Sequence, residues 1–190
     1  MKWFIASDIH GSAYFCKLML EKFKEEKADR LLLLGDILYH GPRNDLPRDY
    51  NPKEVIKMLN EMKESILCVR GNCDTEVDQM VLEFPVLADY AVVDLAERLM
   101  YCTHGHKFIN DNSLKLKEGD IVLSGHTHIP LCEERDGILY LNPGSVSIPK
   151  ENSQHGYMIL HYGTFTWHDL EDNDKDDEGF PDNILNWIDI

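Results

Sequence analysis

Short hydrophobic runs recur along the chain, and each is followed at once by polar residues. Most are three or four residues long and rich in Leu, Ile, Val and aromatic side chains, which is typical of buried strands. They cover residues 3–6, 31–34, 66–69, 99–102 and 121–123. The pattern therefore predicts strands whose ends carry polar groups.

In the segments between the first three hydrophobic runs, apolar residues recur at helical instead of strand spacing. Phe15, Met19 and Phe23 recur at helical spacing, which predicts an amphipathic helix after the first strand. Asn51 and Pro52 are a typical cap and first position for a second helix. The front half therefore indicates a β-α-β-α-β order.

The second half predicts closely spaced strands with few helices. The expected strands are 88–93, 131–135, 138–141, 156–161 and 164–169, besides 99–102 and 121–123. Turn signals such as Asp136-Gly137 join several of them into hairpins. Together with the front half, this order predicts an α/β fold in which two mixed sheets pack face to face with helices outside.

One domain, residues 1–190, is expected from the length, without an internal repeat. Its last part differs in composition. Residues 172–179 are mostly acidic and are expected to be a solvated tail segment. Residues 180–190 carry enough apolar side chains to dock as a terminal helix or to meet a neighbouring subunit, which leaves a homo-oligomer open.

Charge and composition limit the class of partner. The formal net charge is −15 and Lys and Arg form no cluster, so binding to long nucleic acid is disfavoured. No apolar stretch approaches membrane-spanning length, and the first strand leaves no room for a signal peptide. Five cysteines without a CxxC pattern suggest reduced, buried thiols. We therefore expect a cytoplasmic protein with no membrane partner.

Five short motifs at the predicted strand ends carry the chemistry. All contain carboxylate, amide or imidazole groups, and loops after strands of an α/β sheet converge on one rim. The motifs are Asp8-Ile9-His10, Gly35-Asp36, Gly71-Asn72-Cys73-Asp74, His104-Gly105-His106 and Gly125-His126-Thr127-His128. Mixed carboxylate and imidazole ligands suit Mn, Fe, Ni or Zn, and the pattern predicts a hydrolytic site with two divalent metal ions.

Taken singly, these motifs are weak, because an isolated Asp-x-His or Gly-Asp is usually a turn or a cap. Their joint occurrence, each after a strand, outweighs that interpretation. Two cations about 3.5 to 4 Å apart need a bridging ligand, and Asp36 is the candidate carboxylate. A hydroxide between the cations is expected to attack phosphorus in line. Two cations in an acidic protein favour a small phosphate ester as substrate.

The motif order resembles that of the calcineurin-like metallophosphoesterase superfamily. Three segments, residues 35–44, 69–74 and 141–150, more closely resemble the YfcE-type phosphodiesterases, and the likeness runs from about residue 1 to 169. It implies a four-layer α/β/β/α sandwich and a dinuclear phosphodiesterase acting on small phosphodiesters. The imidazole-rich ligand set makes Mn the expected metal. By the resemblance, one metal would be held by Asp8, His10, Asp36 and His128, and the other by Asp36, Asn72, His104 and His126.

One position departs from the superfamily pattern. Many members have a His where this chain has Cys73, and a thiol poorly replaces a group that protonates a leaving group. His106 is a candidate to replace it in part, and Asp74 to orient a neighbouring His or Arg70. Arg43 and Arg70 are candidates to bind a second phosphate or a nucleotide group. Cys73 is expected near the substrate, as a passive filler rather than a nucleophile.

Two other functions compete with this hypothesis. The fold also occurs as a scaffold subunit of the retromer coat, so a non-catalytic interaction module is the alternative. A scaffold would be expected to lose ligands, whereas every ligand position is filled here. A nuclease of the same superfamily would need a basic track, which the chain lacks. The predicted catalytic group comprises Asp36, Asn72, Asp74 and His106.

Overall fold

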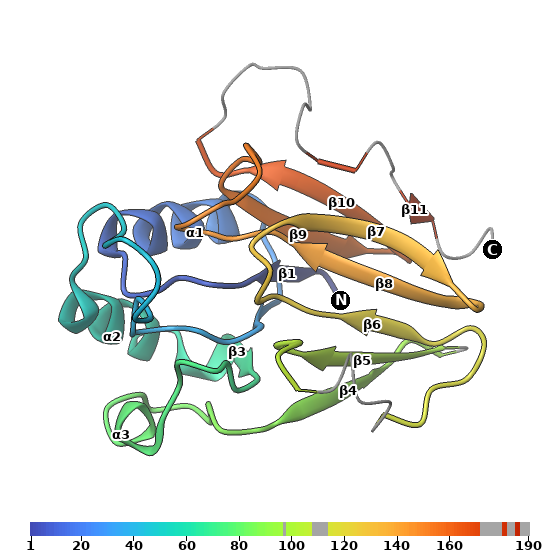
Figure 1. Ribbon diagram of the computed structural model, residues 1–190, viewed down its shortest axis with the longest axis horizontal. Coiled ribbons are helices and arrows are strands. Elements are labelled where there is room, and N and C mark those ends of the chain that lie inside the picture. The colour runs from blue at the N-terminus through green and yellow to red at the C-terminus, as the bar shows by residue number, and fades with distance from the viewer. Residues whose placement is uncertain (97, 108–113, 172–179, 182–184, 187–190) are drawn as a thin grey trace.

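Two β-sheets packed face to face form the centre of the molecule (Figure 1). The structure is a computed structural model that describes residues 1–96, 98–107, 114–171, 180–181 and 185–186. The sheets have six and five strands, and both mix parallel with antiparallel pairs. The predicted α/β architecture of two mixed sheets flanked by helices is confirmed.

The first sheet has the strand order β11-β10-β9-β1-β2-β3. Its strands are β1 (Trp3–Ala6), β2 (Arg30–Leu33), β3 (Ile66–Cys68), β9 (Gly156–His161), β10 (Thr164–Asp169) and β11 (Leu185–Asn186). β1, β2 and β3 run parallel, and their register places Phe4 beside Leu31 and Leu31 beside Ile66. The loops after these three strands therefore leave the sheet at the same edge.

The second sheet has the order β4-β5-β6-β8-β7. Its strands are β4 (Tyr90–Asp94), β5 (Leu99–Thr103), β6 (Ile121–Leu123), β7 (Pro130–Arg135) and β8 (Ile138–Pro143). β5, β6 and β8 are parallel, while β4 and β7 are antiparallel edge strands. The centre of the second sheet is therefore also parallel, and the loops after β5, β6 and β8 leave it at the same edge.

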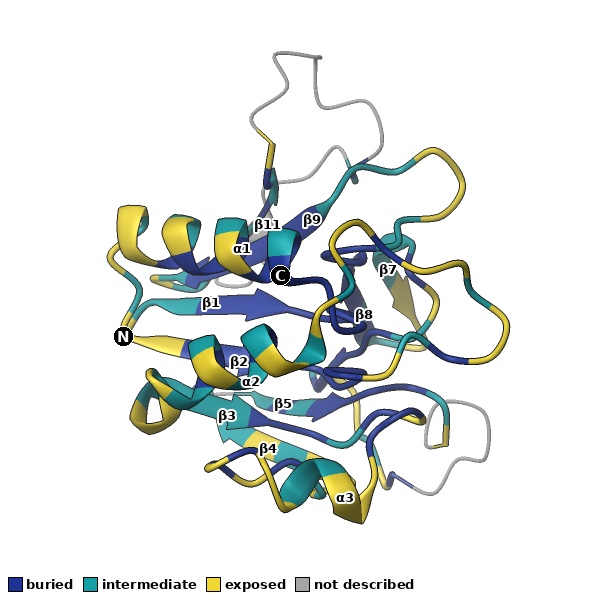
Figure 2. Cartoon of the chain, turned by 90° about the vertical axis from the view of Figure 1, so that its left-hand side faces the viewer, coloured by how far each residue is buried: buried dark blue, intermediate teal, exposed yellow. Residues whose placement is uncertain are grey.

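Helices α1 (Ala13–Glu25) and α2 (Pro52–Asn60) lie against one face of the six-stranded sheet (Figure 2). The Ser12 hydroxyl caps α1 by accepting a hydrogen bond from the backbone N–H of Phe15. Two shorter elements, η1 (Lys63–Ser65) and α3 (Glu76–Gln79), flank β3. Phe15 and Met19 of α1 and Val55 of α2 are buried in this helix–sheet core. Both predicted helices are confirmed.

A second core fills the space between the sheets. Ile5 and Leu32 contribute to it from the first sheet, Met100 and Ile121 from the second, and Phe165 from β10. All five side chains are fully buried. Burial of each contributes about 1.5–3 kcal/mol, so this layer fixes the sheets relative to one another. The loops at the strand ends are held in place by the same core.

The C-terminal part differs from the expected terminal helix. Leu185 and Asn186 form β11, which pairs with Phe165 and Thr164 of β10, and an edge strand rather than a helix therefore occupies this position. Phe180 is buried in the inter-sheet core. The rest of 182–190 and the acidic segment 172–179 lie outside the described residues. Within the described part of the chain, no helix is both long and apolar enough to cross a bilayer.

Candidate metal centre

The predicted ligands come together where the two parallel strand sets end. Three loops of the six-stranded sheet supply Asp8 and His10 after β1, Asp36 after β2 and Asn72 after β3. The five-stranded sheet supplies the others, which are His104 at the end of β5 and His126 and His128 after β6. The site therefore spans both sheets.

One group of side chains gathers around Asp8. Its Oδ1 atom lies 3.5 Å from Nε2 of His10 and 3.3 Å from Nε2 of His128. The two imidazole Nε2 atoms are 3.3 Å apart. Asp8 Oδ1 is buried and has no hydrogen-bond partner among the described residues. A buried carboxylate oxygen facing two imidazole nitrogens is a donor set that fits a divalent cation.

A second group gathers around His104. Its Nε2 atom lies 3.4 Å from Oδ2 of Asp36 and 3.1 Å from Oδ1 of Asn72. The His126 ring is 5.1 Å from the His104 ring, centroid to centroid. Asp36 Oδ2 also lies 3.7 Å from Nε2 of His10, in the first group. Asp36 is therefore placed between the two groups, where a shared ligand would have to lie.

Backbone carbonyls orient three of the imidazoles. Nδ1 of His10 lies 2.7 Å from the Tyr39 carbonyl oxygen. Nδ1 of His104 is 2.6 Å from the carbonyl of Leu34, and Nδ1 of His128 is 2.6 Å from that of Ile148. Because a carbonyl oxygen only accepts, each Nδ1 must donate its proton. Each Nε2 therefore faces inward, as in histidines that bind metals.

Five of the predicted ligands have left-handed backbone conformations, which L-residues adopt uncommonly. The φ angles are 60° at Asp8, 48° at His10, 55° at Asp36, 68° at His126 and 62° at His128. Such conformations cost of order 1–3 kcal/mol each and concentrate at functional sites. Hydrogen bonds between loops hold them, for example from the N–H of His10 to the Asp36 carbonyl at 2.9 Å.

Two glycines allow the loops to approach closely. A Cβ atom at Gly71 would lie 2.1 Å from Oδ1 of Asp36, and one at Gly125 would lie 1.9 Å from the Ser7 hydroxyl. Both distances are far below any contact that a side chain can make. The glycines of the Gly-Asn-Cys-Asp and Gly-His-Thr-His motifs are therefore required because neighbouring loops leave no room for a side chain.

The electrostatics of the site favour bound positive charge. Burial opposes ionisation of Asp8, but the imidazoles of His10 and His128 beside its carboxylate outweigh burial and hold its pKa well below the usual range. Burial likewise opposes protonation of His104, yet Asp36 and Asp8 raise its pKa to about 9. The carboxylates stabilise a cation here, whether a proton on imidazole or a metal ion.

Asp74 holds the loop after β2 against the loop after β3. Its carboxylate accepts hydrogen bonds from the N–H groups of Asp36 at 2.8 Å, Ile37 at 2.9 Å and Gly71 at 2.7 Å. Burial, together with the charge of Asp36, raises its pKa to about 6. These contacts place the carboxylate on backbone amides rather than on a histidine or on Arg70. The geometry assigns Asp74 a positioning role for Asp36.

His106 lies beside the second group rather than in the pocket. Its ring is 5.4 Å from that of His104, and its Nδ1 is buried without a hydrogen-bond partner among the described residues. Burial lowers its pKa to about 4, and the charge of His104 acts in the same direction. His106 is therefore neutral near pH 7, which suits a proton acceptor better than the expected proton donor.

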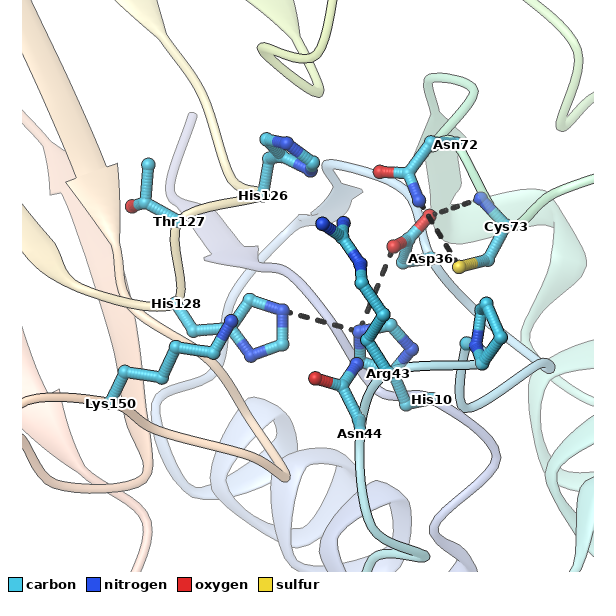
Figure 3. Close-up of a pocket in the computed structure, with 12 residues that line it drawn as sticks. His10, Asp36, Arg43, Asn44, Asn72, Cys73, His126, Thr127, His128 and Lys150 are labelled. Carbon is cyan, nitrogen blue, oxygen red and sulfur yellow. Dashed lines mark hydrogen bonds and ion pairs between the residues drawn. The ribbon is translucent and has the colours of Figure 1, made fainter.

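A pocket of about 440 Å³ opens above the two groups, with Asp36, His10, Asn72, His126 and His128 in its wall (Figure 3). This volume suits a small molecule. Of the predicted substrate-binding residues, Arg43 and Cys73 also line it.

Arg70 lies apart from this pocket. Its Nε donates to the Asp74 carbonyl at 3.1 Å, and its guanidinium pairs with Glu76 at 3.5 Å. These contacts hold the side chain against the start of α3, away from the pocket. Sequence reasoning also missed five lining residues, Gly41, Pro42, Asn44, Thr127 and Lys150. Lys150 stands at the end of the 141–150 segment that carried the resemblance, which was the available signal.

Cys73 lies against Asp36 and Asn72. Its N–H donates to Oδ1 of Asp36 at 2.8 Å, and its sulfur lies 3.2 Å from Nδ2 of Asn72. Burial, reinforced by the Asp36 charge, raises the pKa of the thiol. The thiol is therefore protonated at neutral pH and is a poor nucleophile. The other buried cysteines, Cys16, Cys68 and Cys102, are also free thiols.

Two mixed sheets with carboxylate and imidazole groups at their joined strand ends define a class of metal-dependent hydrolases. The chain belongs to the calcineurin-like phosphoesterase superfamily, whose family model matches residues 1–164. Phosphodiesterase YfcE of Escherichia coli is 47% identical over 160 residues, which cover 84% of this chain and 87% of that protein. The resemblance seen in the motifs is confirmed.

Solved structures agree with this assignment. The structure of YfcE, described as a phosphoesterase from E. coli, matches with a TM-score of 0.87 at 45% identity, covering 90% of this chain and 94% of that one. Vps29 of Entamoeba histolytica, in complex with Zn²⁺, matches with a TM-score of 0.62 at 21% identity over 91% of this chain and 94% of that one. The likeness to Vps29 is one of fold alone.

Proposed function

We propose that the protein is a metal-dependent hydrolase that cleaves small phosphodiesters with two divalent cations, Mn²⁺ first among them. The observation that carries this proposal is the position of Asp36. Its Oδ2 lies 3.7 Å from His10 and 3.4 Å from His104, one imidazole from each group. A carboxylate so placed can serve both cations.

The protein side chains would divide the work as follows. Asp8, His10, Asp36 and His128 would hold one cation, and Asp36, Asn72, His104 and His126 the other. The cations, once bound, would supply Lewis acidity to a water molecule and to the phosphoryl oxygens. The carbonyl contacts of the imidazoles and the brace made by Asp74 keep the ligands in position without further reorganisation.

A preference for diesters with good leaving groups follows from the presence of Cys73 in the pocket wall. By the family resemblance Cys73 takes the position of a histidine, and its raised pKa keeps the thiol protonated but weakly acidic. Such a group donates a proton poorly to a departing alkoxide. Leaving groups that depart as stabilised anions need no such donor. The related YfcE is itself named a phosphodiesterase, which agrees with this substrate class.

Metal removal tests the proposal. Protein treated with chelator should lose hydrolysis of bis(4-nitrophenyl) phosphate and regain it with Mn²⁺ more than with Mg²⁺, because imidazole ligands favour Mn²⁺. A titration of activity against added Mn²⁺ should saturate at two ions for each chain. Full activity after extended dialysis against chelator would overturn the proposal.

The scaffold alternative predicts a different result. A metal-loaded scaffold would bind Mn²⁺ yet hydrolyse neither diesters nor monoesters. A scaffold would be expected to lose ligands, whereas every predicted ligand position is filled here. A panel of monoesters, diesters and cyclic nucleotides, assayed beside the Asp36→Asn variant as a blank, separates an enzyme from a scaffold. Turnover above that blank supports the enzyme.

A further inference from the structure

Two cationic side chains face the pocket from loops that sequence reasoning did not connect. Arg43 comes from the loop after β2, and Lys150 from the segment between β8 and β9. Figure 3 shows the Lys150 side chain reaching toward the His128 ring, and the Arg43 side chain running past His10 with its guanidinium toward Asp36 and His126. They reach the same pocket although they are far apart in sequence.

These cations are unusual for this chain. It has 34 acidic against 19 basic residues, and many basic side chains pair with carboxylates, as Lys107 does with Asp89 at 3.1 Å. Neither Arg43 nor Lys150 forms an ion pair within the part of the chain that the structure describes. The pocket wall contains one carboxylate, Asp36, which the proposed cations would use. The remaining charge of the wall is positive.

Both loops are fixed to ligand histidines. The loop of Arg43 is held because the Tyr39 carbonyl accepts from His10 Nδ1 at 2.7 Å. The loop of Lys150 is held because the Ile148 carbonyl accepts from His128 Nδ1 at 2.6 Å, and the Lys150 N–H donates to the His128 carbonyl at 3.2 Å. The loops that carry the two cations are therefore anchored to the His10 and His128 group.

We propose that Arg43 and Lys150 form a subsite for a second phosphate group of the substrate, distinct from the phosphodiester at the metal centre. A guanidinium and an ammonium together match the nearly two negative charges of a terminal phosphate. A carboxylate, with one charge, matches the pair less well. This inference rests on the proposed function and specifies its substrate class as diesters that carry a terminal phosphate.

Binding to Mn²⁺-loaded protein tests the subsite directly. The probes are thymidine 3′,5′-bisphosphate and thymidine 3′-monophosphate, compared by calorimetry. The wild type should bind the bisphosphate more tightly. Lys150→Gln and Arg43→Gln should each weaken bisphosphate binding about tenfold or more, the value of a hydrogen bond to a charged group, and weaken monophosphate binding much less.

Lys27→Gln is the matched control, because Lys27 is exposed after α1, away from the pocket, and should change neither affinity. Equal weakening of both probes would overturn the subsite, because it would place the cations on the metal-centred phosphate itself. Unchanged affinities would overturn it as well.

Hydrolysis of bis(4-nitrophenyl) phosphate separates the two proposals. This diester has no second phosphate, so Lys150→Gln and Arg43→Gln should change its KM less than they raise KM for 5′-phosphorylated thymidylyl-thymidine relative to the unphosphorylated dinucleotide. If the wild type fails to cleave the aryl diester with Mn²⁺, the proposed function fails, and the calorimetry still decides the subsite.

Discussion

At the scale of single residues, Asp36 differs from the other candidate ligands because it contacts both groups of the site. Oδ2 of Asp36 faces His10 and His104, whereas Asp8 faces His10 and His128 within one group. We predict that Asp36→Asn lowers kcat by more than about a hundredfold, beyond the 10–100-fold typical of outer ligand partners. Asp8→Asn should cost less, because it weakens one cation site.

Steady-state kinetics with metal content measured on the same samples checks this prediction. Asp29→Asn is a suitable control, because Asp29 lies before β2 at the opposite end of that strand. Equal and small losses for Asp36→Asn and Asp8→Asn would remove Asp36 from the shared position.

Cys73 gives a second prediction at this scale. Its thiol lies beside Asp36 and Asn72 and holds its proton tightly. Cys73→His should raise kcat/KM for nucleoside monophosphates relative to nitrophenyl diesters, since an imidazole can assist a poor leaving group. Cys73→Ser controls for loss of the thiol. An unchanged ratio between the two substrates would show that position 73 does not act on the leaving group.

At the scale of elements, the site depends on how closely the strand-end loops approach. Gly71, after β3, leaves room for Asp36, after β2, and an added Cβ would meet Oδ1 of Asp36 at 2.1 Å. Gly71→Ala should therefore displace Asp36 and weaken Mn²⁺ binding about tenfold or more. Calorimetric titration of the variant with Mn²⁺ measures the effect.

Gly119→Ala is the comparison for this prediction. A Cβ at Gly119 would meet no atom within 4 Å, but its φ of +91° makes alanine strained there. This variant should lower the melting temperature, by an amount equivalent to about 1–2 kcal/mol, and keep the wild-type affinity for Mn²⁺. If both variants lose the same metal affinity, the close approach of the loops is not the cause.

At the scale of the whole molecule, the candidate centre joins the two sheets. Asp8, Asp36 and Asn72 belong to loops of the six-stranded sheet, and His104 and His128 to loops of the five-stranded one. A metal bound across them should stabilise the folded state by about 2.7 kcal/mol when free metal is a hundred times its Kd. For a chain of 190 residues this corresponds to a rise in melting temperature of roughly 5–11 °C.

Differential scanning calorimetry with and without Mn²⁺ measures that rise. His128→Ala should lower it, because one ligand from the second sheet is lost, while Lys27→Gln should keep it. A rise of the same size in His128→Ala and the wild type would mean that the metal does not bridge the sheets through His128.

The sequence by itself determined the strands other than Leu185–Asn186, the two main helices and the family. Trp3–Ala6, Ile121–Leu123, Gly156–His161 and Thr164–Asp169 have the predicted bounds, because alternating or continuous apolar runs report burial directly. The order of the ligand motifs was readable because each follows a strand, and parallel strands end at one edge. Local signals were enough for these features.

Only the tertiary structure decided how the motifs act. The left-handed conformations of Asp8, His10 and Asp36 and the carbonyl partners of the imidazoles depend on contacts between loops far apart in the chain. Arg70 turns to Glu76 while Lys150 reaches the pocket, since side-chain direction follows from packing and not from spacing along the sequence. The C-terminal strand at Leu185–Asn186 forms because backbone groups at the edge of β10 are available to pair with it. This pairing joins residues about twenty positions apart, and no local sequence pattern encodes it.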